Sequence, residues 1–518
     1  MSELTNYDVA VIGSGFGGLG AALTLAERGV RVALYETLKY PGGCAGTFTR
    51  KGYHFDAGAT LSSGFGDRQL FRTWMDRYHL KINLEYLSTA IHFRSPEFNL
   101  DIPSDRDEMI DRFCKLPHAP QEEIRRFFAH QKSVADTLWT FFDDPDLLPP
   151  LRLNALWSHL KRTHRYLPLL LDINQSLFSV MQRYGLAQFS PLINYLNALC
   201  QITTQCSIGE VEAPLALATI DYYNRGTAHI KGGIGQLARG LCDAISHRGG
   251  EIRFTDKVSE IIPQADGTYL IKSRRGESRV SGVVLNALPE TAQRLCPPLT
   301  TLPKWATSAQ EEIKKGWGAA MLYLVAEDDE QFDEQAQHWQ MVGDSSSPLQ
   351  EGNHVFCSIS SRGEYDRAPA GSRVMTLSTH VPMTKMRALT DDEKARYIEG
   401  IQYRMRETFN QNCPEWSDRV YFCMTGSPRT FERFTGRPEG LVGGPPRTKG
   451  LRHYLTLNST AVMPRFYLTG DSFFPGQSTL ATATGGARVA ERLFKQLPLS
   501  QPSESILLTQ APLAKGER

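Results

Sequence analysis

Apolar runs, glycine turns and helical spacing alternate at the start of the chain and predict a β-α-β unit. Residues Tyr7 to Ile12 form an apolar, β-branched run, and Gly13 to Gly18 form a glycine-rich turn. The segment from Leu19 to Arg28 has the apolar spacing of a helix that ends at Gly29, and Val30 to Tyr35 has the character of a second strand. One such unit in about 30 residues predicts a parallel sheet.

Further pieces of the same kind return in the second half of the chain. We expect a helix over Ile234 to His247, followed by strands over Glu251 to Phe254 and Val283 to Asn286. Near the end, a strand over Arg465 to Thr469 leads into a helix from about Ser478 to Phe494. The predicted sheet therefore draws its strands from both ends of the chain.

The regions between these pieces differ in character. Residues 71 to 220 have largely helical patterns, whereas residues 299 to 449 mix helices with strand-like runs such as Ala320 to Val325. We predict an α/β fold with a discontinuous Rossmann-like nucleotide-binding domain and a mixed α+β, partly helical substrate domain. The predicted segments are 1–70, 221–298 and 450–496 for the nucleotide-binding domain, 71–220 and 299–449 for the substrate domain, and 497–518 for a disordered tail.

Length, charge and cysteine content narrow the function classes. The 518 residues suit two domains, and 57 basic against 56 acidic residues leave a net charge of +1, so we expect no nucleic-acid partner. The nine cysteines lack metal-binding spacing, which predicts reduced thiols and no metal site. Without a signal peptide or an apolar run of about 20 residues, the sequence predicts a cytoplasmic protein that does not span a membrane.

The first glycine turn, GSGFGG, has the spacing of a dinucleotide-binding motif. Gly13 permits the tight turn, Gly15 lets the backbone approach a pyrophosphate, and Gly18 lets helix and strand pack closely, with Phe16 and Gly17 between them. The phosphates would meet the unpaired N–H groups of a helix N-terminus. Because the motif alone is weak, its context matters: Glu36 closes the second strand about 20 residues later, where a carboxylate accepts bonds from ribose hydroxyls and repels a 2′-phosphate.

Three other segments are candidates for the same cofactor. Gly42 and Gly43, followed by Cys44, form a second glycine turn, and Gly58, Ala59 and Thr60 form a third; small residues there allow close approach to a flat ring. Near the C-terminus, a strand, a Gly-Asp turn and a helix start offer a carboxylate and free N–H groups. The candidate residues of that last segment are Gly470, Asp471, Ser478, Thr479 and Leu480.

Taken together, VIGSGFGGLGAALTLAERG, PGGCAGTF, FDAGAT, KGGIGQLARGL, GLVGGPPRT and LTGDSFFPG resemble the phytoene desaturase, carotenoid isomerase and retinol saturase family of FAD-dependent oxidoreductases. The resemblance implies non-covalent FAD, with Asp471 near the ribityl or pyrophosphate region and the N–H groups near Thr479 and Leu480 facing the flavin pyrimidine. It also implies that the backbone of Val258 contacts the adenine. Amine oxidases often carry arginine where this chain has Cys44, which favours the polyene enzymes.

The family implies a long, apolar polyene substrate. Our leading hypothesis is a desaturase that transfers a hydride to flavin N5. A flavin-dependent isomerase and a saturase are the alternatives, and a non-catalytic lipid-binding escort protein is a remote one. The sequence shows a single dinucleotide motif, so it indicates no second site for a nicotinamide co-substrate. We therefore expect reduced flavin to pass electrons to an acceptor such as a quinone or oxygen. No acid, base or nucleophile can be assigned, so the catalytic residues stay unknown.

One segment offers a route to such a substrate. No acidic residue occurs from Leu147 to Leu171, where basic and apolar side chains interleave at helical spacing. Such a pattern suits peripheral attachment to anionic lipid, and equally suits a helix packed on its own domain with a solvated basic face. The basic set is Arg152, His159, Lys161, Arg162, His164 and Arg165, and the apolar set is Leu153, Leu156, Trp157, Leu160 and Leu167.

Overall fold

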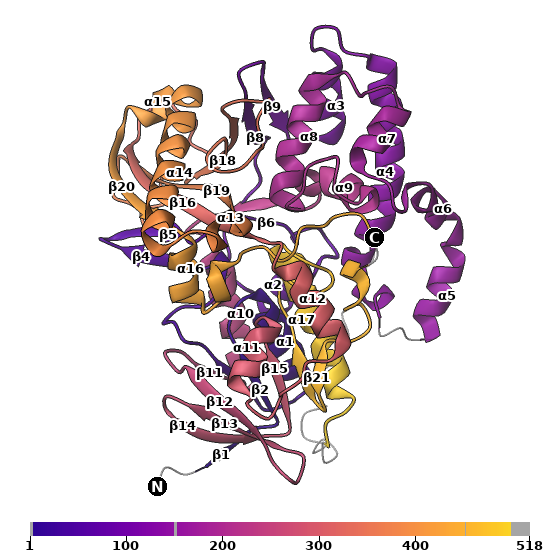
Figure 1. Cartoon of the computed structure of the whole chain (residues 1–518), viewed down its shortest axis with the longest axis vertical. Helices are drawn as coiled ribbons and strands as arrows, with labels where there is room; N and C mark the ends of the chain where they lie inside the picture. The colour runs from indigo at the N-terminus through magenta and orange to yellow at the C-terminus, as the bar shows by residue number, and fades with distance from the viewer. Residues whose placement is uncertain (1–3, 150–152, 451, 499–518) are drawn as a thin grey trace, which may run out of the picture.

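A six-stranded sheet forms the centre of one half of the molecule in the computed structural model, which describes residues 4–149, 153–450 and 452–498 (Figure 1). Five of its strands are parallel, and β21 pairs antiparallel at one edge. In spatial order the strands are β11 (Glu251–Arg253), β3 (Val32–Tyr35), β2 (Val9–Ile12), β15 (Gly282–Leu285), β22 (Phe466–Leu468) and β21 (Ala461–Met463). Numbered along the chain, the parallel strands lie in the order 3-2-1-4-5 of doubly wound nucleotide-binding folds, which confirms the predicted α/β class.

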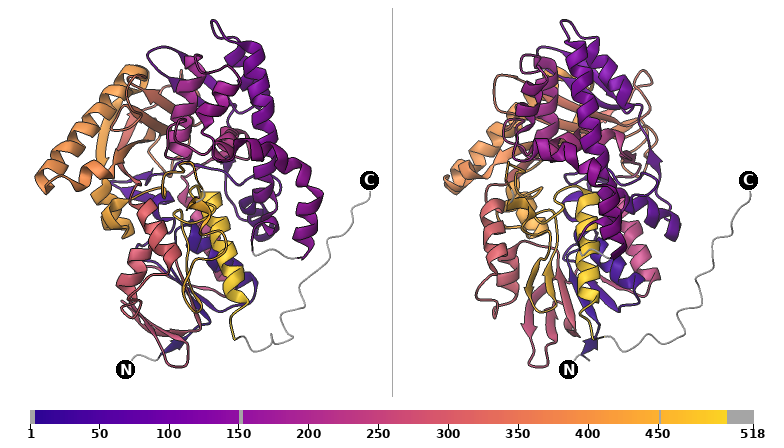
Figure 2. Two further views of the ribbon diagram at one scale, coloured as in Figure 1. Left: turned by 45° about the vertical axis from the view of Figure 1, so that its right-hand side comes forward. Right: turned by 90° about the vertical axis from the view of Figure 1, so that its right-hand side faces the viewer.

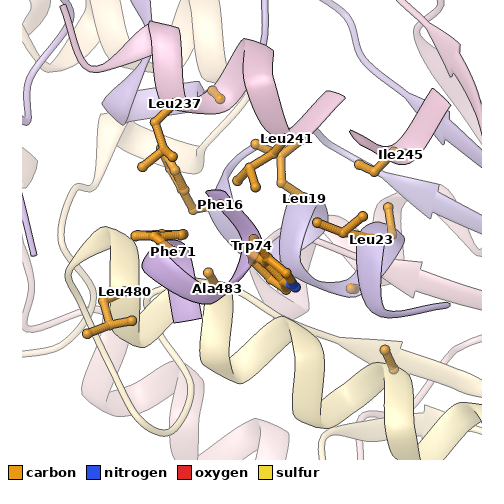
Figure 3. Close-up of a cluster of buried hydrophobic side chains, with 14 of the residues drawn as sticks. Phe16, Leu19, Leu23, Phe71, Trp74, Leu237, Leu241, Ile245, Leu480 and Ala483 are labelled. Atoms are coloured by element: carbon orange, nitrogen blue, oxygen red, sulfur yellow. The ribbon is translucent and has the colours of Figure 1, made fainter. Parts of the chain in front are cut away.

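The first and last helices of the fold lie against each other beside this sheet. Helix α1 (Phe16–Glu27) packs between α10 (Gly235–His247) and α17 (Thr479–Phe494), and their apolar side chains form one buried cluster (Figure 3). The backbones touch, because a Cβ added at Gly486 would lie 1.9 Å from the carbonyl oxygen of Gly17. The sequence predicted these three helices to within a few residues, since each has a clear apolar period.

A seven-stranded sheet lies in the other half of the molecule (Figures 1 and 2). Helix α14 (Asp391–Asn412) packs on this sheet. The predicted strand at Ala320 to Val325 falls within one of the two longest strands of the sheet. In spatial order the strands are β20 (Val420–Gly426), β16 (Trp317–Glu327), β19 (Ser372–Pro382), β18 (His354–Ile359), β17 (Gln337–Val342), β8 (Thr89–Arg94) and β9 (Asn99–Pro103). Two of these strands, β8 and β9, come from the region predicted as largely helical. Strand β8 pairs with β17, far away in the sequence, and β9 pairs with β8 at the edge of the sheet.

Small sheets and short helices complete the architecture. A meander inserted between β11 and β15 includes the strand that begins at Val258, and a hairpin follows the second glycine turn. The remaining strands are β1 (Thr5–Asn6), β4 (Thr47–Arg50), β5 (Tyr53–Asp56), β6 (Leu61–Ser62), β7 (Leu84–Glu85), β10 (Ala228–Ile230), β12 (Val258–Pro263), β13 (Tyr269–Ser273) and β14 (Gly276–Val280). The shorter helices here are α2 (Leu70–Tyr78), α11 (Pro289–Leu295), α12 (Lys304–Ile313), α13 (Met383–Arg387), α15 (Pro414–Ser417) and α16 (Pro428–Thr435).

A helical layer covers the side of the molecule opposite α14 (Figure 1). Its helices enclose a core of their own, rich in phenylalanine and leucine. They are α3 (Arg106–Cys114), α4 (Gln121–Asp143), α5 (Leu153–Lys161), α6 (Thr163–Asp172), α7 (Leu177–Arg183), α8 (Ser190–Thr203) and α9 (Ala213–Ile220). Across the described residues, no helix is both long enough and apolar enough to cross a membrane.

Helices α5 and α6 form an arm at the edge of this layer (Figure 1). The sequence predicted a single helical stripe from Leu147 to Leu171, which is wrong, because the helix breaks at Arg162. At this break, backbone N–H groups bond to the carbonyl three residues earlier, as in a 3₁₀ turn, instead of four residues earlier. The Thr163 hydroxyl also donates to the carbonyl of Leu160, at 2.9 Å, and so competes with the backbone hydrogen bonds of the helix.

Candidate functional site

A cavity of about 750 Å³ lies where the sheet order reverses, at the carboxyl ends of β2 and β15. This is the position at which open α/β sheets bind ligands. Every residue predicted to bind the cofactor lines the cavity except Gly17, Gly18 and Val258. The structure thus brings together segments from both ends of the chain and from the hairpin region.

The first glycine turn is shaped by contacts that only glycine permits. Gly13 has a φ of 95°, and a Cβ at Gly18 would lie 1.9 Å from the Gly13 carbonyl oxygen. The second glycine turn lies directly against the first, because the N–H of Gly42 donates to the carbonyl of Ser14 at 2.9 Å. Backbone atoms of both turns therefore face the same end of the cavity, as binding of a pyrophosphate requires.

Glu36 lies beside the first turn at the end of β3. Its carboxylate accepts hydrogen bonds from the Ser14 N–H at 2.9 Å, from the Ser14 hydroxyl at 2.6 Å and from the Leu38 N–H at 2.8 Å. These bonds fix the side chain at the cavity wall, where it is 9% exposed. An oriented carboxylate next to a phosphate-binding turn suits the ribose of an adenosine group.

The C-terminal segment closes the other side of the cavity. A Cβ at Gly17 would lie 3.1 Å from the N–H nitrogen of Gly470, so the two turns touch. Ser478 caps α17 by accepting a hydrogen bond from the Ala481 N–H at 3.1 Å, and the Thr479 hydroxyl lies 2.8 Å from that of Ser62. The positive end of α17 therefore points at the cavity, where it would favour negative charge on a ligand.

Asn286 and Arg437 lie beside the cofactor-binding turns, although the sequence analysis did not predict them. Asn286 follows β15, and its side chain lies between the glycine turns, 2.6 Å from where a Cβ at Gly15 would be. Its position at the end of a buried parallel strand was a usable signal. Arg437 donates from Nη1 to the Asp471 carboxylate at 3.0 Å and lies near Cys44, the position where amine oxidases often carry arginine. No local pattern marks Arg437, because it arrives from a loop after α16.

Three predicted residues lie behind the cavity wall. Gly17 and Gly18 are in the first turn of α1, where they allow the close packing described above. Val258 begins β12 and is buried in a cluster with Ile12 and Tyr35. A contact between the Val258 backbone and an adenine stays a prediction.

The far half of the cavity is apolar. Leu138, Trp139 and Phe142 of α4 form part of its wall, and the Trp139 indole donates to the carbonyl of Ala218 at 2.9 Å. The wall continues through residues 147–149 to His159 of α5, so the cavity reaches the base of the arm. Burial lowers the pKa of His380, another wall residue, to about 4, so this imidazole is neutral at pH 7.

The arm exposes most of its predicted apolar set. Trp157, Leu160 and Leu167 are between 60% and 66% exposed, and Leu170 and Leu171 extend the patch. Lys161, His164 and Arg165 are exposed beside it. Two basic residues of the predicted set, His159 and Arg162, are not exposed in this way. Arg152 and the side chain of Leu153 lie outside the described residues.

His159 and Arg162 are these two exceptions. His159 turns inward, with Nδ1 2.7 Å from the Tyr166 hydroxyl and Nε2 2.9 Å from the Leu147 carbonyl oxygen. Arg162 is half-buried. The prediction that both belong to a basic outer face is therefore wrong, because His159 is held by Tyr166 and Leu147 and Arg162 lies at the break between the two helices.

The glycine-rich segment at residues 232 to 235 is a helix start, as the sequence predicted. A three-residue strand, β10, precedes it, although the sequence indicated none. This strand pairs antiparallel with β6 and β7 in a separate sheet, so it does not create a second β-α-β nucleotide site. Among the described residues, no group of three or more His, Cys, Asp or Glu side chains could hold a metal ion.

Sequence comparison finds relatives that each align with more than half of this chain. Prolycopene isomerase of Arabidopsis thaliana is 27% identical over 521 residues, covering 96% of this chain and 84% of that protein. Human all-trans-retinol 13,14-reductase is 23% identical and covers 90% of this chain and 82% of its own length. The 4,4'-diapophytoene desaturase of Methylomonas sp is 22% identical over 61% of this chain and 60% of that protein.

The fold matches solved oxidases, and a family comparison agrees. Putrescine oxidase bound to putrescine superimposes with a TM-score of 0.63 at 14% identity, covering 95% of this chain and all of that one. Residues 16–493 match the flavin containing amine oxidoreductases. The paired glycine turns, oriented Glu36 and capped α17 fit the cofactor of that family. This chain therefore belongs to the flavin containing amine oxidoreductase family and is an enzyme whose cofactor is FAD.

Proposed function

We propose that this protein is an FAD-dependent desaturase of a long, carotenoid-like polyene. The observation that carries the proposal is the cavity, which extends from the flavin-binding turns to the apolar wall of α4 and the base of the arm. Bound FAD supplies a hydride acceptor. The glycine turns and Glu36 would hold the cofactor, while the aromatic wall would align the polyene and exclude water.

Cis/trans isomerisation of such a polyene is a second candidate. It is favoured by one observation: prolycopene isomerases align with nearly the whole chain, whereas the diapophytoene desaturase aligns with 61% of it. Desaturation and retinol reduction, in turn, are redox reactions, as expected of an oxidoreductase family. All of these relatives are named for conjugated apolar substrates, so the substrate class is common to both candidates.

We further propose that the arm binds the surface of an anionic membrane. Six large apolar side chains of the arm, between Leu156 and Leu171, are more than half exposed, and the exposed Lys161, His164 and Arg165 complement lipid phosphates. Because the cavity reaches the base of the arm, docking there would bring its apolar end to the layer in which polyenes dissolve. A peripheral, cytoplasmic location follows from this proposal.

The reaction is tested with purified FAD-loaded protein and a poly-cis polyene in anionic liposomes under anaerobic conditions, with a quinone as electron acceptor. Desaturation predicts a product two hydrogens lighter, with absorption at longer wavelength, and bleaching of the flavin when quinone is omitted. A product of unchanged mass, formed only after the flavin is reduced, would establish isomerisation instead. Turnover that requires NAD(P)H would contradict the proposed quinone or oxygen acceptor.

A further inference from the structure

A chain of hydroxyl and imidazole groups leads from the cavity into the protein interior. Thr60 lines the cavity, and its Oγ1 lies 2.5 Å from the Oγ of Ser358 on β18. The same Ser358 oxygen lies 2.7 Å from Nδ1 of His338 on β17. All three side chains are at least 94% buried, so the chain of contacts is shielded from bulk water.

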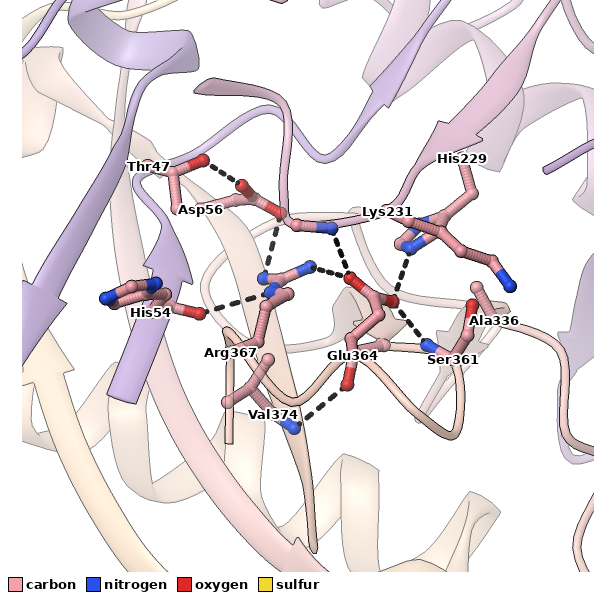
Figure 4. Close-up of polar contacts among 12 residues, drawn as sticks. Thr47, His54, Asp56, His229, Lys231, Ala336, Ser361, Glu364, Arg367 and Val374 are labelled. Atoms are coloured by element: carbon pink, nitrogen blue, oxygen red, sulfur yellow. Dashed lines mark hydrogen bonds and ion pairs between the residues drawn. The ribbon is translucent and has the colours of Figure 1, made fainter. Parts of the chain in front are cut away.

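The inner end of this chain lies near a buried, hydrogen-bonded pair of side chains, His229 and Glu364, which Figure 4 shows. The ring of His338 lies 5.6 Å from that of His229, and His229 Nε2 lies 2.9 Å from the Glu364 carboxylate. Glu364 also accepts hydrogen bonds from the N–H groups of Gly232 at 2.7 Å and Ser361 at 2.6 Å. Its negative charge is therefore fixed in place on the far side of His229.

Two imidazole nitrogens of this cluster are unsatisfied. Among the described residues, neither Nε2 of His338 nor Nδ1 of His229 has a hydrogen-bond partner, although both atoms are buried. Buried polar atoms without partners are costly, and retaining two in neighbouring rings calls for a functional reason.

We propose that Thr60 and Ser358 relay a proton from the polyene in the cavity to the imidazole of His338, which lies beside the buried His229–Glu364 pair. The proposal rests on the desaturase function proposed above, because desaturation releases a proton that needs an acceptor. The sequence offered no candidate for that acceptor. Residues beyond Thr60 act through it, so Ser358 and His338 are positioning residues in this scheme.

The proton and electrons balance as follows in the proposed step. Bound FAD would accept a hydride from one C–H bond of the substrate, and the substrate would be left as a cation. The adjacent C–H bond then gives its electron pair to the new double bond and its proton to Thr60 Oγ1. Thr60 passes its own hydroxyl proton to Ser358, and Ser358 passes its proton to His338 Nδ1. Burial and the neighbouring His229 lower the pKa of His338, so its imidazole is neutral before the step and can accept the proton, and the Glu364 carboxylate favours the imidazolium that forms.

The test replaces the relay hydroxyls while preserving shape. Thr60→Val and Ser358→Ala should lower kcat at least tenfold, on the scale of general acid-base effects, and leave KM for the polyene unchanged. Thr60→Ser restores the hydroxyl and should recover most of kcat. The matched control is Thr379→Val: Thr379 also lines the cavity and is buried, but its hydroxyl donates to the His354 carbonyl at 2.7 Å, outside the relay.

Flavin content, flavin absorption and Tm are measured for every variant, so that loss of the fold or of FAD is separated from loss of the relay. The proposal fails if Thr60→Val and Ser358→Ala keep the wild-type kcat, or if Thr379→Val loses as much. It fails equally if Thr60→Ser behaves like Thr60→Val. Failure of the desaturase function is a different result, since the wild-type enzyme itself would then form no product of lower mass.

Discussion

At the scale of single residues, Glu36 illustrates how one side chain joins local geometry to cofactor choice. Its carboxylate is oriented by the N–H and hydroxyl groups of Ser14 and by the N–H of Leu38. The sequence predicted Glu36 from its position after a strand, because that spacing is set by the β-α-β unit itself. Its exact orientation depends on Ser14 within the glycine turn.

We expect Glu36→Ala to weaken FAD binding by about 1 to 3 kcal/mol, the scale of charged hydrogen bonds. Titration of apoprotein with FAD, followed by flavin fluorescence, measures the change in Kd. Glu260→Ala is the control, since Glu260 pairs with Lys272 on the surface of β12. Equal Kd values for wild type and Glu36→Ala would remove Glu36 from the binding site.

At the scale of elements, the packing of α1 on α17 depends on the absence of side chains at their contact. Gly486→Ala should destabilise the protein by several kcal/mol and lower its FAD content, because the new methyl group would overlap the backbone of Gly17. Gly400→Ala, within α14, meets no atom within 4 Å and should stabilise by about 0.5 to 1 kcal/mol. Urea unfolding of both variants checks the contrast, and similar destabilisation by both would contradict it.

The arm is the element that should determine membrane binding. We expect Trp157→Ser with Leu160→Ser to reduce flotation with anionic liposomes, because burial of those side chains is lost. Tyr365→Ser with Tyr403→Ser is the matched control, since these side chains are as exposed but lie elsewhere. Wild-type binding should also weaken as salt rises. Equal flotation of the two double variants would assign the arm another role.

The elements also show how far the sequence could carry the prediction. Strands β2, β3, β15 and β22 and their helices were predictable, because apolar periods and glycine turns are local signals. Strand β8 was missed because it depends on pairing with residues about 250 positions away, and β9 was missed with it because its partner is β8. The same limit applies to the site: the glycines and Glu36 carry spacing signals, whereas Arg437 and the relay residues come together only in the folded chain.

At the scale of the whole molecule, buried histidines couple stability to pH. Burial lowers the pKa of His354 to about 3 and those of His380 and His453 to about 4, and also lowers the pKa of His338. In the unfolded chain these groups bind protons near pH 6.5. Stability should therefore be complete above pH 6.5 and fall as pH decreases toward 4.

Within that window, each of these groups lowers the free energy of unfolding by at most about 1.4 kcal/mol for each unit by which the pH falls. Urea unfolding at saturating FAD should accordingly give a lower free energy of unfolding at pH 5 than at pH 7. His354→Gln should reduce the slope of the unfolding free energy against pH by the contribution of about one proton. A free energy that stays constant from pH 7 to pH 5 would show that these imidazoles are protonated in the native state.

The contact between the first and last helices also has a consequence for biosynthesis. The ribosome synthesises the glycine turn of α1 long before the Gly470 turn and α17. The nascent N-terminal segment thus has no closed pocket for the flavin until α17 has been made. Cofactor loading must then follow the synthesis of α17, and the supply of free FAD from that moment governs how much newly made protein becomes holoenzyme.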